Sequence, residues 1–125
     1  MLFTLLIFLG AGFGGVSRYW ASNGIYALFG RGFPYGTLFV NASGSFLIGL
    51  FFVLIMDRFN NSGAELRALL IIGFLGGYTT FSSFSIETWQ LIENGAWITA
   101  STNVFLNVFL SLSLTWLGIL GGRLL

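Results

Sequence analysis

The chain reads Gly73-Phe74-Leu75-Gly76-Gly77-Tyr78-Thr79-Thr80-Phe81-Ser82-Ser83-Phe84-Ser85 in the middle of an uncharged, hydrophobic segment. A helix that served only as a lipid anchor would have no use for paired glycines followed by a run of hydroxyl side chains. Because an unsatisfied polar group is costly in hydrocarbon, this segment is expected to face protein or water rather than acyl chains. We therefore expect the function to reside in this segment.

The composition indicates an integral membrane protein. Of the 125 residues, 56% are hydrophobic and 7% are charged, and the mean hydropathy is +0.91. Such a chain has too little polar surface to face water on all sides. The net charge of +1 offers no footprint for nucleic acid, and the absence of cysteine excludes disulfides and thiolate metal sites.

The charged residues divide the sequence into four uncharged segments: Met1–Ser17, Gly32–Met56, Ala68–Ile86 and Asn94–Gly122. Each is about long enough to cross a hydrocarbon core of roughly 30 Å as a helix. We predict one membrane domain, residues 1–125, with helices near 2–28, 35–57, 64–93 and 96–123 and a break near 76–80. The first segment lacks a basic leader and a clear cleavage site, which favours a retained helix over a signal peptide.

The distribution of arginines gives little topological bias. Arg58, Arg67 and Arg123 fall on one side of the predicted membrane, while Arg31, with Arg18, falls on the other. Weak bias permits insertion in both orientations and hence an antiparallel homodimer. A single orientation with a poor signal is the alternative, and charge alone does not distinguish the two.

Glycines recur at the small-xxx-small spacing that allows close helix contacts. The pairs are Gly10 with Gly14, Gly73 with Gly77, and Gly118 with Gly122. Packing within one subunit and packing between subunits explain these pairs equally well.

Polar residues recur every four positions in the last helix: Thr99, Asn103, Asn107, Ser111 and Thr115. This spacing keeps them near one helix face. Asparagines are costly against lipid, so the stripe predicts either an aqueous path or a set of hydrogen bonds between helices.

Gly76 and Gly77 lower helix propensity at mid-membrane, and the hydroxyls of Thr79 and Thr80 are suited to bind carbonyls that a break would release. Freed carbonyls suit a small cation, whereas the start of the following half-helix suits an anion. A continuous helix that uses the glycines for tight packing is the alternative.

Phe81 and Phe84 are spaced i, i+3 and share a helix face. Their ring edges suit an anion and their ring faces a cation, and simple core packing explains the pair as well.

Glu87 is the one acid at the edge of a span, and no nucleophile, metal cluster or phosphate loop can be assembled, so an enzyme is not expected. Two other classes stay open: a small dual-topology proton-coupled drug exporter, which would need a membrane-embedded acid, and a structural membrane subunit without transport.

Three motifs carry a resemblance to a known family: residues 76–85 followed by Glu87, the run Gly36-Thr37-Leu38-Phe39-Val40-Asn41, and the run Gly14-Gly15-Val16-Ser17-Arg18-Tyr19. Together they resemble the Fluc (CrcB-type) fluoride channels over essentially the whole chain. The resemblance implies an all-α membrane protein whose two copies form an antiparallel, dual-topology homodimer in the lipid of a bacterial inner membrane. It also implies passive export of fluoride, which reduces fluoride toxicity in the cytoplasm.

The resemblance further implies which residues form the site. Those expected to line the fluoride pathway are Asn41, Phe81, Phe84, Ser82, Ser83, Asn107 and Ser111. A structural sodium ion at the dimer interface is expected on the backbone carbonyls of Gly76 and Thr79. Arg18 and Glu87 match accessory positions whose roles stay open, and Asn103 departs from the family by standing where some relatives have an aromatic hydroxyl. Since the expected donors are neutral, we predict uncoupled flow.

Overall fold

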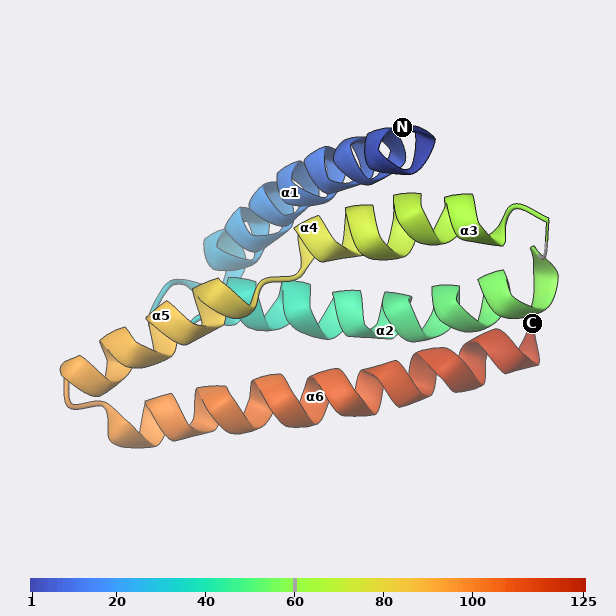
Figure 1. Cartoon of the computed structure of the whole chain (residues 1–125). Helices are drawn as coiled ribbons and strands as arrows, with labels where there is room; N and C mark the ends of the chain where they lie inside the picture. The colour runs from blue at the N-terminus through green and yellow to red at the C-terminus, as the bar shows by residue number, and fades with distance from the viewer. Residues whose placement is uncertain (60) are drawn as a thin grey trace.

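A computed structural model describes residues 1–59 and 61–125. Its elements are α1 (Leu2–Phe29), α2 (Tyr35–Arg58), α3 (Gly63–Leu66), the π-helix η1 (Arg67–Leu75), α4 (Gly76–Tyr78), α5 (Phe81–Glu93) and α6 (Trp97–Leu124). They make four passes in alternating directions, with α3, η1, α4 and α5 in line as the third pass and both termini at the same end (Figure 1). The outer ends of the four passes differ from the expected ones by one residue at most, but Gly76–Tyr78, which we expected within a break, are helical.

All four passes are long and apolar enough to cross a membrane. Large hydrophobic side chains cover the outside of the bundle; among them, Phe8 is 74% exposed, Phe13 70% and Leu112 69%. A water-soluble protein would not present so much apolar surface, whereas acyl chains can cover it. The chain is a multi-pass membrane protein.

Glycines on α2 and α6 bring these two helices close together. A methyl group added at Gly49 would overlap the carbonyl oxygen of Thr115, and one added at Gly118 would overlap that of Phe46. Such contacts between backbones increase the van der Waals attraction that holds helices together in lipid. Accordingly, α2 and α6 are in extensive contact along their lengths.

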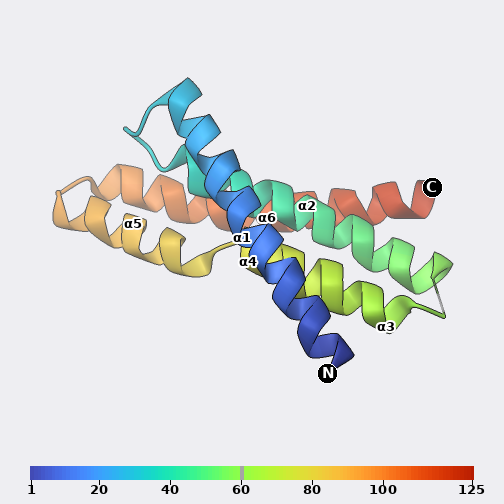
Figure 2. The same cartoon turned by 90° about the horizontal axis from the view of Figure 1, so that it is seen from above.

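The first and third passes form a second close pair. Methyl groups at Gly10 and Gly14 would overlap carbonyl oxygens of η1, and one at Gly77 would lie 2.5 Å from the Ala11 oxygen. Figure 2 shows α1 crossing the third pass at α4. Packing within one subunit therefore accounts for Gly10, Gly14 and Gly77.

Between α4 and α5 the backbone of the third pass is extended. Thr79 has ψ 158° and Thr80 has φ −150° and ψ 115°. The Thr79 hydroxyl donates to the Leu75 carbonyl at 2.8 Å, but this carbonyl also accepts the Thr79 N–H at 3.0 Å, so it is not a carbonyl released by a break as we had expected. The Thr80 hydroxyl was also expected to bind a released carbonyl. Instead it accepts a hydrogen bond from the Ser83 N–H at 3.1 Å and caps the start of α5.

Candidate functional site

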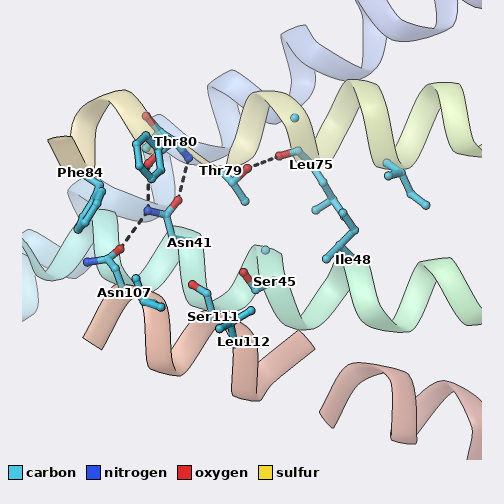
Figure 3. A pocket seen from close by; sticks show the side chains of 15 residues that line it. Asn41, Ser45, Ile48, Leu75, Thr79, Thr80, Phe84, Asn107, Ser111 and Leu112 are labelled. Carbon is cyan, nitrogen blue, oxygen red and sulfur yellow. Dashed lines mark hydrogen bonds between the residues drawn. The ribbon is translucent and has the colours of Figure 1, made fainter. Parts of the chain in front are cut away.

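A cavity of about 460 Å³ lies beside the extended segment, between α2, the third pass and α6 (Figure 3). Its polar lining consists of Asn41, Ser45, Thr79, Thr80, Asn107 and Ser111, and its other lining residues include Gly44, Gly76, Phe81 and Phe84. Seven of the expected residues therefore meet in one place although they come from three passes.

Two of the three expected serines, Ser82 and Ser83, do not line this cavity. Ser82 is exposed, with its Oγ 3.4 Å from the Thr80 Oγ1, and Ser83 lines a second cavity. Both serines belong to the first turn of α5, which begins where the Thr80 side chain accepts a hydrogen bond from the Ser83 N–H. The start of this helix therefore determines where the two serines lie.

Asn41 on α2 supplies hydrogen-bond partners to the backbone of Thr80, which lies outside the helices of the third pass. Its Oδ1 accepts from the Thr80 N–H at 2.7 Å, and its Nδ2 donates to the Thr80 carbonyl at 3.0 Å. In a continuous helix the Thr80 N–H would bind the Gly76 carbonyl, four residues earlier. One amide side chain thus stabilises the extended backbone. Gly44 leaves room for the extended segment, because a methyl group at Gly44 would overlap Thr79 Cγ2.

The same amide connects the extended segment to α6. Asn41 Nδ2 donates to Asn107 Oδ1 at 3.1 Å, and Asn107 Nδ2 donates to Asn103 Oδ1 at 2.9 Å (Figure 3 shows the first of these bonds). Asn103 is 1% exposed and Asn107 6%. The polar stripe of α6 therefore divides: Asn107 and Ser111 line the cavity, whereas Asn103 lies behind it and Thr115 binds the Ser45 carbonyl.

Phe81 and Phe84 stand in the first turn of α5. Their ring centroids are 5.3 Å apart and their planes are tilted by 59°. Phe81 is 78% exposed on the outside of the subunit, while Phe84 is half-buried and lies at the cavity near Asn107. The pair therefore extends from the cavity wall to the subunit surface.

A second cavity, of about 580 Å³, lies on the other side of the extended segment, and Thr80 lines both. Arg18, Ser83 and Glu87 are among its lining residues. The Glu87 carboxylate accepts hydrogen bonds from Thr37 at 3.0 Å and from Tyr26 at 3.1 Å. Thr80 therefore separates a neutral cavity from one that contains charged groups.

The family assignment follows from comparison with known proteins. The family described as "CrcB-like protein, Camphor Resistance (CrcB)" matches residues 5–119. The chain belongs to this family. CrcB-like relatives include a protein named "Fluoride-specific ion channel FluC" from Coxiella burnetii (strain CbuK_Q154), 56% identical over 96% of this chain and 97% of the relative. A relative of the same name from Geobacter metallireducens is 50% identical over 98% of both chains.

Sequence reasoning missed four residues at the site of this CrcB-like protein: Ser45, which lines the neutral cavity, Tyr26 and Thr37, which bind Glu87, and Thr88, which binds Asn103. Thr37 lies one helical turn before Asn41, so it was detectable as a polar neighbour on the same face. Tyr26 carries no such signal, because it is 61 residues from Glu87 in the chain. Gly36 makes its approach possible, since a methyl group there would overlap the Tyr26 ring.

Proposed function

We propose that this protein is a fluoride channel that exports fluoride passively and so lowers its toxicity in the cytoplasm. One observation carries the proposal: a cavity lined by neutral hydrogen-bonding groups lies at the extended segment of a chain that aligns over 96% or more of its length with proteins named fluoride-specific ion channels. The neutral lining supports conduction, because an ion must bind well enough to enter a pore and weakly enough to leave it.

The cavity chemistry suits a small, strongly hydrated anion. The amides of Asn41 and Asn107 and the hydroxyl of Ser111 can replace water around the ion without changing charge. The positive end of α5 lies beside the same cavity, because Thr80, Phe81 and Phe84 at the start of this helix line it. Because the amide donors already have protein acceptors, fluoride would exchange one hydrogen bond for another rather than meet a rigid trap.

A second, antiparallel copy would complete the pathway. Gly76, Phe81 and Leu112 border the cavity, and all three are exposed in the single chain. A partner that covered them would convert an open depression into an enclosed passage. The weak arginine bias is compatible with insertion in both orientations, and a bacterial inner membrane is the proposed location.

A sodium ion between the two copies also fits the residues present. The Thr80 N–H binds Asn41, so the Gly76 carbonyl loses the donor it would have in a helix, and the Thr79 carbonyl lies in extended backbone. Uncharged carbonyl oxygens are ligands that hard cations accept. Gly76 and Thr79 of each copy would hold the ion, which would join the two subunits by neutralising facing carbonyl dipoles.

A structural subunit without transport is the second candidate, because the amides of Asn41, Asn103 and Asn107 all bind within the subunit. A proton-coupled drug exporter is disfavoured: Asp57, Glu65, Glu87 and Glu93 are the acids, none lies in the first pass, and Glu87 is already bound by two hydroxyls.

Reconstitution separates these functions. Purified protein in liposomes loaded with potassium fluoride should release fluoride when a potassium ionophore removes the electrical barrier, at the same rate with and without a proton gradient. Chloride-loaded liposomes should retain their anion. Release that requires a proton gradient would favour the exporter, and retention of fluoride by folded protein would favour the structural subunit.

A further inference from the structure

Tyr26 contacts two groups of opposite charge in the second cavity. The Arg31 guanidinium carbon lies 4.4 Å from the centroid of the Tyr26 ring, and the Tyr26 hydroxyl donates to the Glu87 carboxylate at 3.1 Å. All three residues line this cavity. Arg31 also donates to Asn23, and Glu87 also accepts from Thr37. The two charges are therefore bound by neutral groups rather than by each other.

The position of the Arg31 side chain depends on the Tyr26 ring. Arg31 is exposed in a turn between Gly30 and Gly32, and a methyl group added at either glycine would meet no atom within 4 Å. The turn therefore offers no packing beside Arg31 that would fix its side chain. The hydrogen bond from Arg31 to Asn23, at 3.5 Å, is longer than is usual for N–H donors, so the ring face is the better contact.

The ring of Tyr26 is itself held by the packing of α1 on α2. A methyl group added at Gly36 would overlap the ring carbon Cε2 of Tyr26, so the ring lies directly against the backbone of α2. The Tyr26 hydroxyl, at the far end of the side chain, is bound to Glu87. Tyr26 is therefore a fixed support, whereas Arg31 belongs to an exposed turn.

We infer that Tyr26 is a positioning residue that keeps Arg31 apart from Glu87, so that the positive charge stays available to an incoming anion. The inference rests on the proposed function for its effect on fluoride. Without the aromatic side chain, Glu87 loses a donor and Arg31 loses its support, and opposite charges in one cavity attract each other. An ion pair between Arg31 and Glu87 would cancel the charge that draws an anion into the cavity.

Substitutions at Tyr26 separate the ring from the hydroxyl. Tyr26→Leu removes both, and we expect fluoride flux about two- to fivefold below that of the parent at low salt, the range that corresponds to an exposed cation–π contact. Tyr26→Phe keeps the ring and should retain most of the flux. Phe29→Leu is the matched control, because Phe29 lies near the same end of α1, does not line the second cavity and contacts the ring of Tyr35; its flux should equal the parent value.

The dependence on salt and on Arg31 separates positioning from simple loss of stability. Charge is screened within about 3 Å at 1 M salt, so the loss in Tyr26→Leu should disappear there, whereas a loss caused by poor folding should persist. In an Arg31→Gln background, Tyr26→Leu should cause no further loss, because no guanidinium is left to pair with Glu87. A further loss in that background, or equal losses in Tyr26→Phe and Tyr26→Leu, would overturn the inference.

A spectroscopic readout distinguishes this inference from the proposed function. A ring face shifts a nearby proton upfield, so the Arg31 Nε–H resonance should be shifted upfield in the parent and in Tyr26→Phe, and pairing with Glu87 should move it downfield in Tyr26→Leu. Should Tyr26→Leu fail to fold, Tyr26→Met removes the ring with a more adaptable side chain.

If the parent conducts no fluoride, the proposed function fails, while the Arg31 resonance still tests where the guanidinium lies. An unshifted Arg31 resonance in the parent would show that the ring does not hold the guanidinium. A resonance in Tyr26→Leu equal to that of a free arginine would show that no pair forms, and either result would contradict the positioning role.

Discussion

Asn41→Leu tests how the extended segment and the pathway are coupled. Leucine has nearly the same shape as asparagine, so the change removes the bonds to the Thr80 N–H, the Thr80 carbonyl and Asn107 with little change in volume. Interhelical hydrogen bonds in membranes contribute about 0.6 kcal/mol each on average, so we expect a loss of about 2 kcal/mol in the free energy of unfolding. The loss should be larger if the buried Thr80 groups find no substitute.

The effect on transport should exceed the effect on stability. A leucine offers no donor to an anion, so fluoride efflux from liposomes should fall by at least about tenfold in protein that remains folded. Stability is measured by reversible unfolding in mixed micelles, with Thr102→Val as the control, because the exposed Thr102 hydroxyl binds only the Ile98 carbonyl of its own helix. Parent stability in Asn41→Leu would show that the three bonds do not support the extended segment, and parent flux would show that Asn41 does not serve the ion.

Three further changes test separate parts of the account. Phe81→Ile and Phe84→Ile should each lower fluoride flux while the dimer stays intact in cross-linking, because the aromatic edge is lost and apolar volume is largely kept; parent rates in both would make the rings packing residues. Gly49→Ala should destabilise the protein by about 1–3 kcal/mol through overlap with the Thr115 carbonyl, whereas Gly121→Ala, which meets open space, should not; equal unfolding midpoints would refute the close packing of α2 on α6. Arg31 borders the second cavity, where its charge would attract an anion, so Arg31→Gln should slow fluoride flux several-fold at low salt and not near 1 M salt, where charge is screened within about 3 Å; a salt-independent effect would contradict that role.

Much of the fold could be predicted because lipid imposes simple rules on a chain. Every backbone group must be bonded within the membrane, so uncharged segments of sufficient length become helices, and the positions of Arg31, Arg58 and Glu93 mark the ends of the passes. The π-helix of η1 carries no comparable local signal. Gly76 and Gly77 drew attention as weak helix formers, yet they are helical, and the extended residues are Thr79 and Thr80. Their conformation depends on Asn41, which is 39 residues from Thr80 in the chain.

The site was predictable where residue type alone restricts the options. Asparagines within an apolar helix must find polar partners, so Asn41 and Asn107 stood out. That these two residues bind each other could not be predicted, because they are 66 residues apart in the chain and local periodicity carries no signal over that distance. The same limit applies to Thr88: a threonine near a helix end is unremarkable until the fold places Asn103 against it.

The reversal potential of a reconstituted bilayer tests the central claim most directly. With a tenfold fluoride gradient, symmetrical chloride and equal pH on both sides, a passive fluoride channel should give a potential of about 59 mV in magnitude. That potential should not move when a pH gradient is imposed. A potential near zero would show that the pathway does not select fluoride, and a potential that follows the pH gradient would show coupled transport.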